Sequence, residues 1–326
     1  MKDGNMEIKD IKKVTCVGGG VIGYSYALIM ALKGLNVYLY DISDDSLNLA
    51  KTRVHESLKP LVSNNIIQSN EVESIENRIH YTKDMKEAVE NTYFIQESVP
   101  EHYEVKWSTI AEIEKYAPAS AIIASSTSGL LITEIAKNAI HPERIIGGHP
   151  YNPPHLIPLV EISKGEHSSE DTITSALAFY TMIGREPIVL QKEALGFIGN
   201  RLQMALYREV AELVMRGVCT IEDADKAVTY GPGIRWGIMG PSLVFELGGG
   251  KVGVDGLMNH LHDSITLWLN DMADWKEFPP EFSEIAKQGV LEEIKNRQPD
   301  KGNTEESLTT YRDNMLIEML KLHDKL

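Results

Sequence analysis

Cysteine, long apolar runs and an excess of positive charge are all missing from this sequence. Its 326 residues include only two cysteines, Cys16 and Cys219, so the sequence predicts neither a disulfide framework nor a metal-binding CxxC pair. No apolar stretch approaches the roughly 18 residues that suggest a membrane span, and residues 1–7 lack the apolar core of a signal peptide. These absences predict a cytoplasmic protein without a membrane partner.

Acidic residues outnumber basic ones by 47 to 32, which gives a formal net charge of -15. Such a chain repels phosphate backbones, so we expect no nucleic-acid partner. The hydrophobic fraction of 43% and the charged fraction of 24% are ordinary for globular proteins. The length is sufficient for two domains with their own cores.

Short β-rich runs alternate with helical patterns over the first 190 residues. The runs predicted as strands are residues 12–17, 36–40, 93–96, 121–124, 144–148 and 186–191. Helical patterns cover residues 21–35 and 44–80, and an amphipathic helix is predicted from Gly196 to Val218. The sequence therefore predicts an α/β fold: a Rossmann-type doubly wound parallel sheet in residues 1–190, followed by an all-helical domain in residues 191–326.

A glycine motif joins the first predicted strand to the first predicted helix. Gly18, Gly20 and Gly23 form G-x-G-x-x-G, with Val21 and Ile22 between the last two glycines. The first glycine permits a tight turn, the second lets a pyrophosphate approach the backbone, and the third lets the helix pack on the strand. The helix N-terminus adds free N–H groups. A glycine-rich turn without a ligand is the alternative.

Asp41 follows the second predicted strand, eighteen residues after Gly23. A carboxylate at this place accepts the ribose hydroxyls of NAD and repels the extra phosphate of NADP. The sequence therefore predicts NAD as the cofactor; nothing in it adds a signal specific for a flavin.

The segment from Gly148 to Ile162 is rich in proline and is predicted to be a rigid, non-helical loop. His149 begins it, and Glu161 lies near its end, in a strand-like Leu-Val-Glu-Ile. An alcohol dehydrogenase without a metal needs a base with a near-neutral pKa, which a histidine provides. A carboxylate behind the histidine orients its ring. A structural histidine that caps the loop is the alternative.

Several motifs, in order and spacing, resemble the 3-hydroxyacyl-CoA dehydrogenase superfamily along nearly the whole chain. The matching stretches are residues 17–23, 96–106, 125–130, 149–161 and 196–202. The resemblance implies that His149 is the base and Glu161 its partner. It also implies that Ser128 and Asn200 donate hydrogen bonds to the substrate oxygen, and that the protein is a homodimer.

By the same resemblance, Glu101 and Lys106 lie beside the nicotinamide ribose; a solvated surface pair is the alternative. Ser128 follows the strand predicted at residues 121–124, where ligands of parallel sheets bind, although it could instead cap a helix. Asn200 lies in the first turn of the long helix, with a plain surface position as the alternative.

Two features depart from the acyl-CoA members. Their usual Asn-Thr-Ser-Ser is Ser-Thr-Ser-Gly at residues 126–129. Their lysine-rich helical pair is replaced by residues 51–77, which contain three basic residues and four glutamates. This is a poor surface for the phosphates of coenzyme A.

The closer resemblance is to two branches that use free hydroxy acids: the L-carnitine dehydrogenases, and the L-gulonate 3-dehydrogenases with lambda-crystallin. Residues 125–131 and 231–236 look more like the first branch, and residues 151–154 more like the second. Gulonate oxidation, 3-hydroxybutyryl-CoA oxidation and a structural, crystallin-like role stay open as alternatives.

The chemistry of L-carnitine, a carboxylate with a trimethylammonium group, calls for one cation and several aromatic faces. Arg235 and Trp236 can supply both, and Tyr151 and Phe245 can add ring faces; a packed loop is the alternative. We therefore expect NAD-dependent oxidation of L-carnitine to 3-dehydrocarnitine.

Overall fold

The computed structural model describes residues 10–326. The N-terminal residues on which the signal-peptide expectation depends lie outside this part. The chain forms two compact units: residues up to 200 together with 313–326, and residues 201–312. The division falls at residue 200, whereas the sequence placed a boundary between residues 190 and 191; that boundary stays a prediction.

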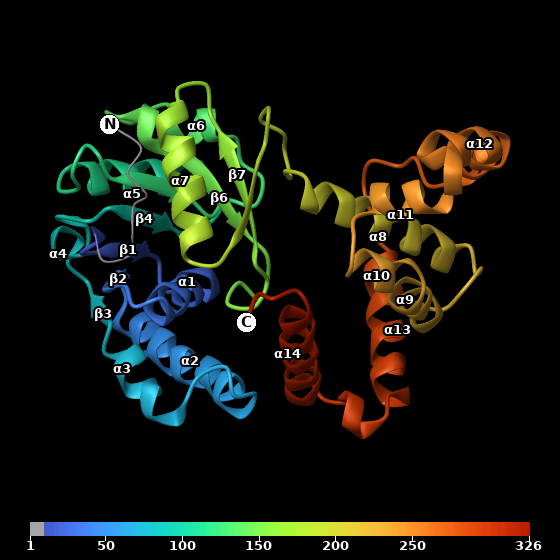
Figure 1. Ribbon diagram of the computed structural model, residues 1–326, viewed down its shortest axis with the longest axis horizontal. Helices are drawn as coiled ribbons and strands as arrows, with labels where there is room; N and C mark the ends of the chain where they lie inside the picture. The colour runs from blue at the N-terminus through green and yellow to red at the C-terminus, as the bar shows by residue number, and fades with distance from the viewer. Residues whose placement is uncertain (1–9) are drawn as a thin grey trace. The chain divides into compact units, whose positions relative to one another are not determined.

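The first unit is built on an eight-stranded sheet with the order β3-β2-β1-β4-β5-β6-β7-β8 (Figure 1). The strands are β1 Val14–Val17, β2 Val37–Tyr40, β3 Ile79–Thr82, β4 Phe94–Glu97, β5 Ile122–Ser125, β6 Ile145–Pro150, β7 Leu159–Lys164 and β8 Glu186–Val189. Neighbouring strands are parallel except β6 and β7, which are antiparallel. The predicted Rossmann-type sheet is confirmed.

Helices cover both faces of this sheet. The helices before the second unit are α1 Val21–Leu32, α2 Asp44–Ser63, α3 Val72–Glu76, α4 Met85–Val89, α5 Tyr103–Glu114, α6 Ile132–Ala136 and α7 Glu170–Met182, with short 3-10 turns at Ser69–Glu71 and Pro142–Arg144. Along β5, Ile122 and Ala124 join the apolar cluster with α1, α2 and α7, whereas Ile123 joins the cluster with α4, α5 and α6. Successive strand residues face opposite sides, so the two clusters lie on opposite faces.

The second unit, residues 201–312, contains helices, turns and loops but no strand. The remaining helices are α8 Gly199–Met215, α9 Ile221–Tyr230, α10 Pro232–Trp236, α11 Pro241–Gly248, α12 Gly253–Asp271, α13 Phe282–Asn296 and α14 Glu305–Leu322, with 3-10 turns at Gly250–Val252 and Pro299–Lys301. Ala211, Ile221 and Phe282 form its small buried core. Within residues 10–326, no helix is both long enough and apolar enough to cross a bilayer.

Two local expectations were wrong. The stretch predicted as helical, residues 44–80, ends in strand β3. The four residues of β3 form a strand because they pair with β2, and this pairing is not visible in the local sequence pattern. Helix α8 begins at Gly199 instead of Gly196, since Gly196 and Phe197 have φ angles of 72° and 49°, outside the right-handed helical region.

Candidate active site

The glycine turn after β1 has the geometry that its sequence predicted. Gly18 has a φ of 103°, and a Cβ atom there would lie 2.7 Å from the carbonyl oxygen of Ser98. A Cβ on Gly23 would lie 1.7 Å from the Gly18 oxygen. Around Gly20 the space is open, and no side chain caps the N-terminus of α1, which starts with Val21 and Ile22. Since no side chain caps them, the first N–H groups of α1 are available to a pyrophosphate.

A cavity of about 880 Å³ lies beside this turn and is lined by Gly18, Gly20 and Asp41, among others. The Asp41 carboxylate accepts hydrogen bonds from the backbone N–H groups of Gly19 (2.7 Å) and Ser43 (3.0 Å). These two bonds orient the carboxylate at the end of β2 and leave it with acceptor positions for ribose hydroxyls. The residues present thus fit an NAD cofactor.

His149 and Glu161 are direct neighbours across two antiparallel strands. His149 lies in β6 and pairs in register with Glu161 in β7. The distance between His149 Nδ1 and Glu161 Oε2 is 2.8 Å, and both residues are buried, with 5% and 0% exposed. The strand-like character predicted for the stretch around Glu161 is confirmed, whereas the predicted loop is wrong for His149, because the loop covers only positions 151–158. Paired residues of adjacent strands point to the same face, which brings the two side chains together.

The second oxygen of Glu161 is held by backbone groups. Its Oε1 accepts hydrogen bonds from the N–H groups of Ile198 and Gly199, each at 2.9 Å. The left-handed turn at Phe197 leads the chain to this position. Burial raises the pKa of Glu161, but the hydrogen bonds from His149, Gly199 and Ile198 outweigh it, so the net pKa lies below its ordinary value. No sequence pattern indicates these partners, because every residue except proline carries a backbone N–H.

Aromatic rings fix the imidazole of His149. The rings of Tyr151 and Phe197 contact it edge-on, with centroid distances of 5.2 and 5.4 Å. Because an ionised carboxylate can only accept hydrogen bonds, the hydrogen between Glu161 and His149 is bonded to Nδ1 of His149. The other ring nitrogen, Nε2, has no hydrogen-bond partner among the described residues and can act as a base.

Ser128 and Asn200 join the same cluster. The Asn200 side-chain amide donates to the backbone oxygen of Ser128 (2.9 Å), and the Tyr151 hydroxyl donates to Asn200 Oδ1 (3.4 Å). Burial first, and then the nearby Glu161 charge, raise the pKa of Tyr151 to about 12, so this phenol stays protonated. The structure therefore brings together His149, Glu161, Ser128 and Asn200, and it adds Tyr151, which the sequence had suggested only as a substrate contact.

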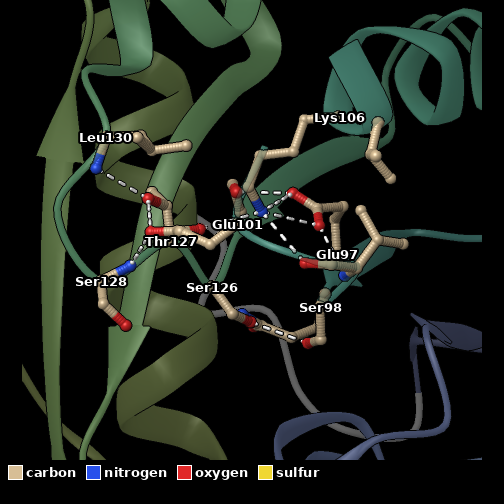
Figure 2. A network of polar contacts seen from close by, with 12 residues as sticks. Glu97, Ser98, Glu101, Lys106, Ser126, Thr127, Ser128 and Leu130 are labelled. Carbon is tan, nitrogen blue, oxygen red and sulfur yellow. Dashed lines mark hydrogen bonds and ion pairs between the residues drawn. The ribbon is translucent and has the colours of Figure 1, made fainter. Parts of the chain in front are cut away.

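A polar network adjoins Ser128 (Figure 2); Lys106 and Glu97 are buried in it, whereas 43% of the Glu101 side chain is exposed. Glu101 accepts hydrogen bonds from Thr127 and Ser128, and its other oxygen lies 3.5 Å from the Lys106 ammonium. Lys106 also contacts both oxygens of Glu97, at 3.0 and 3.1 Å. The sequence reasoning missed Glu97, although a carboxylate at the end of an apolar strand and nine residues before a lysine is a detectable signal.

Three residues expected to contact substrate belong to the second unit. Arg235 and Trp236 end the short helix α10, and Phe245 lies in α11. All three are exposed, with 40% of Trp236 and 44% of Phe245 accessible. Within residues 10–326, neither ring makes a cation–π contact. Tyr151 belongs to the first unit.

The mostly parallel sheet, the glycine turn and the acidic residue after β2 define a dinucleotide-binding protein. Comparison with known families gives the same result. The NAD-binding domain of 3-hydroxyacyl-CoA dehydrogenase matches residues 13–194, and the C-terminal domain of that enzyme matches residues 196–285. The chain belongs to the 3-hydroxyacyl-CoA dehydrogenase family.

Individual relatives cover nearly the whole chain. An L-carnitine dehydrogenase of Bacillus cereus is 35% identical over 98% of this chain and 95% of its own. One of Oceanobacillus iheyensis is 33% identical, over 96% and 98%. Among solved structures, 5-formyl-3-hydroxy-2-methylpyridine 4-carboxylic acid 5-dehydrogenase has a TM-score of 0.77 at 27% identity, over 96% and 97%. The chain is thus an NAD-dependent oxidoreductase that acts on the CH–OH group of a small molecule.

Replacing Asp41 with alanine is expected to weaken NAD⁺ binding by about tenfold and to relax discrimination against NADP⁺. The change removes the ribose acceptor and the charge that repels a 2′-phosphate, with a loss of ~1.4 kcal/mol. Titration calorimetry with both dinucleotides measures the two affinities. Asp44→Ala, an exposed carboxylate at the start of α2, is the control. Unchanged affinities for both dinucleotides in the Asp41 variant would contradict the assignment.

Proposed function

We propose that this protein oxidises the 3-hydroxyl of L-carnitine to 3-dehydrocarnitine with NAD⁺. The observation that carries the proposal is the similarity to L-carnitine dehydrogenases over almost the full length of both chains. The charge of α2 and the following segment supports a free acid as substrate. Residues 51–77 contain three basic residues against four glutamates, which does not favour coenzyme A phosphates.

In this proposal, Nε2 of His149 removes the proton of the substrate hydroxyl. The Glu161 carboxylate stabilises the imidazolium that forms and keeps the ring oriented through Nδ1. The hydroxyl of Ser128 and the amide of Asn200 donate hydrogen bonds to the substrate oxygen, on which negative charge develops. When bound at the glycine turn, NAD⁺ supplies the oxidising power for the alcohol carbon.

Recognition of the two ends of carnitine is proposed for residues of the second unit. The Arg235 guanidinium would pair with the carboxylate, and the Trp236 ring would face the trimethylammonium group. Phe245 would add a further ring face. The homodimer implied by the family resemblance belongs to the same proposal.

The Trp236→Ala variant is expected to raise the KM for L-carnitine by about two- to thirtyfold, with little change in kcat. This range corresponds to the ~0.5–2 kcal/mol of a cation–π contact. Trp268→Ala is the matched control, because Trp268 is an exposed tryptophan of the same unit, in α12. An unchanged KM in the Trp236 variant would remove the cation–π argument.

Absorbance of NADH gives the direct test of the substrate. L-carnitine, L-gulonate and 3-hydroxybutyryl-CoA are offered side by side to the purified protein with NAD⁺. The highest kcat/KM is expected for L-carnitine. A higher value for either other compound would refute the carnitine assignment, and no NADH from any of them would favour the crystallin-like alternative.

A further inference from the structure

A row of polar side chains joins the strand that carries His149 to the cavity beside the glycine turn. The row consists of Tyr180, Gln96, Ser126 and Ser98. Gln96 lies in β4 and Tyr180 in α7, and both are fully buried. Because buried polar groups need hydrogen-bond partners, the direction of each bond in this row follows from the donors and acceptors that meet there.

The orientation of the Gln96 amide is fixed by Gly148, the residue before His149. The side-chain nitrogen Nε2 of Gln96 lies 3.1 Å from the carbonyl oxygen of Gly148. A carbonyl oxygen only accepts hydrogen bonds, so the group that faces it must be the NH₂ group of the amide. The amide oxygen Oε1 therefore faces the Tyr180 hydroxyl, which donates to it at 2.7 Å. Burial raises the pKa of Tyr180, so this hydroxyl keeps its proton.

The second hydrogen of the Gln96 NH₂ group points to Ser126, whose Oγ lies 2.8 Å from Nε2. Because the amide nitrogen is the donor, Ser126 Oγ accepts here, and its own hydrogen goes to another acceptor. Among the described residues its other side-chain partner is the hydroxyl of Ser98, at 2.8 Å (Figure 2). Ser126 therefore donates to Ser98, and the hydrogen of the Ser98 hydroxyl is left for a further acceptor.

Ser98 lies next to the glycine turn. Its backbone N–H donates to the carbonyl oxygen of Val17, the last residue of β1, at 2.7 Å. Its own carbonyl oxygen would lie 2.7 Å from a Cβ atom on Gly18. Ser98 is half-buried and lines the cavity of about 880 Å³ together with Gly18 and Gly20. The hydrogen of its hydroxyl is therefore available to a ligand in that cavity.

The acceptor expected at this place is a pyrophosphate oxygen of the cofactor. In a dinucleotide-binding fold the pyrophosphate approaches the backbone of the glycine turn, and Ser98 adjoins that turn. A phosphate oxygen only accepts hydrogen bonds, and its charge strengthens them. The Ser98 hydroxyl suits such an acceptor, because its oxygen already accepts from Ser126 and its hydrogen is free to be donated.

We propose that Ser98 is a cofactor-binding residue whose hydroxyl donates to a pyrophosphate oxygen of NAD⁺, and that Gln96 and Ser126 are positioning residues which keep that hydrogen directed to the cofactor. The same Gln96 amide holds the carbonyl of Gly148, so one buried side chain contacts both the row that leads to the cavity and the strand that carries His149. The proposal concerns the NAD⁺ site and does not depend on which hydroxy acid is oxidised.

Titration calorimetry on the whole protein without substrate measures the contribution of Ser98. Ser98→Ala should raise the Kd for NAD⁺ about tenfold, because a hydrogen bond to a charged group contributes a factor of this order. The Kd for ADP, which has two phosphates but no nicotinamide ribose, should rise by a similar factor. The Kd for adenosine, which has no phosphate, should stay the same. Ser74→Ala, which changes an exposed serine of α3, is the matched control.

A double-mutant cycle tests the row behind Ser98. Ser126→Ala removes the donor that holds the Ser98 hydroxyl, and it should raise the Kd for NAD⁺ about two- to fivefold. In the variant that carries both changes, the Kd should be no higher than in Ser98→Ala, since Ser126 acts only through Ser98. Gln96 is kept, because its loss would leave the Tyr180 hydroxyl and the Gly148 carbonyl unpaired.

Each part of the proposal has an outcome that overturns it. A change of less than about threefold in the NAD⁺ Kd of Ser98→Ala overturns the cofactor contact. A rise for NAD⁺ that is absent for ADP would assign the hydroxyl to the nicotinamide ribose, and an equal rise for adenosine would assign it to the adenosine half; either overturns the pyrophosphate contact. Effects of Ser98→Ala and Ser126→Ala that add in the double variant overturn the action of Ser126 through Ser98.

Discussion

Replacing His149 with alanine is expected to lower kcat by about 10²- to 10⁴-fold, the usual contribution of a general base. The variant loses Nε2, the ring nitrogen proposed to take the substrate proton, while the glycine turn and Asp41 keep their contacts. NAD⁺ binding should therefore be unchanged. Stopped-flow or steady-state kinetics of NADH formation measure kcat, and titration calorimetry measures the affinity for NAD⁺.

The control for this experiment is His167→Ala, which changes an exposed histidine of the same unit. If kcat of the His149 variant falls less than tenfold, the assignment of the base is wrong. Loss of NAD⁺ affinity together with kcat would also contradict it, because His149 does not line the cavity beside the glycine turn.

The second large effect is expected for Glu161→Gln. The glutamine amide keeps the size of the side chain but lacks the charge that stabilises the imidazolium. Its NH₂ group can also face Nδ1 of His149, which carries a proton and needs an acceptor. We expect kcat to fall by about 10²- to 10⁴-fold with NAD⁺ affinity unchanged. A fall of less than tenfold would show that the carboxylate is not needed to orient the base.

Glu161 also couples stability to pH. Its pKa in the folded protein lies below the ordinary value, so the ionised carboxylate stabilises the fold above the ordinary pKa of about 4.3, and this contribution is lost as the pH falls through the lowered value. We therefore expect the unmodified protein to have a higher free energy of unfolding than Glu161→Gln at neutral pH, and this difference to become smaller as the pH is lowered. Denaturant unfolding at several pH values measures it. A difference that does not depend on pH would contradict the lowered pKa.

A different loss is expected in Glu161→Ala, where the N–H groups of Ile198 and Gly199 lose their acceptor. Both bonds are part-buried, and a hydrogen bond to a charged group contributes about 1.5–3 kcal/mol at most. The alanine variant should therefore unfold at lower denaturant concentration than the glutamine variant. This comparison separates the structural role of Glu161 from its effect on the base.

Local chemistry explains what could be predicted of the cofactor site. At Gly18 the backbone needs a positive φ, and at Gly23 a Cβ atom would collide with the turn, so both requirements are visible as glycine in the sequence. Asp41 is recognisable because it follows an apolar strand at a regular spacing. NAD as cofactor and the Rossmann-type sheet are both supported by the family comparison.

The relation between His149 and Glu161 could be predicted only in part. The residue types indicated a base and its partner, but the prolines around them favoured a loop. In the structure, antiparallel pairing of β6 with β7 puts the two side chains opposite each other. Register between strands depends on the whole sheet, and a short segment does not reveal it.

The sequence by itself determined the class of fold and the glycine turn, because both depend on patterns that are local in the chain, and it indicated His149 and Glu161 as the candidate base and its partner. Only the tertiary structure decided how these groups are held: the backbone donors of Glu161, and the contacts from Glu97 through Lys106 and Glu101 to Ser128. Such contacts join strands, loops and helices that are distant in the chain, and they form only when packing excludes water and every buried polar group must find a partner.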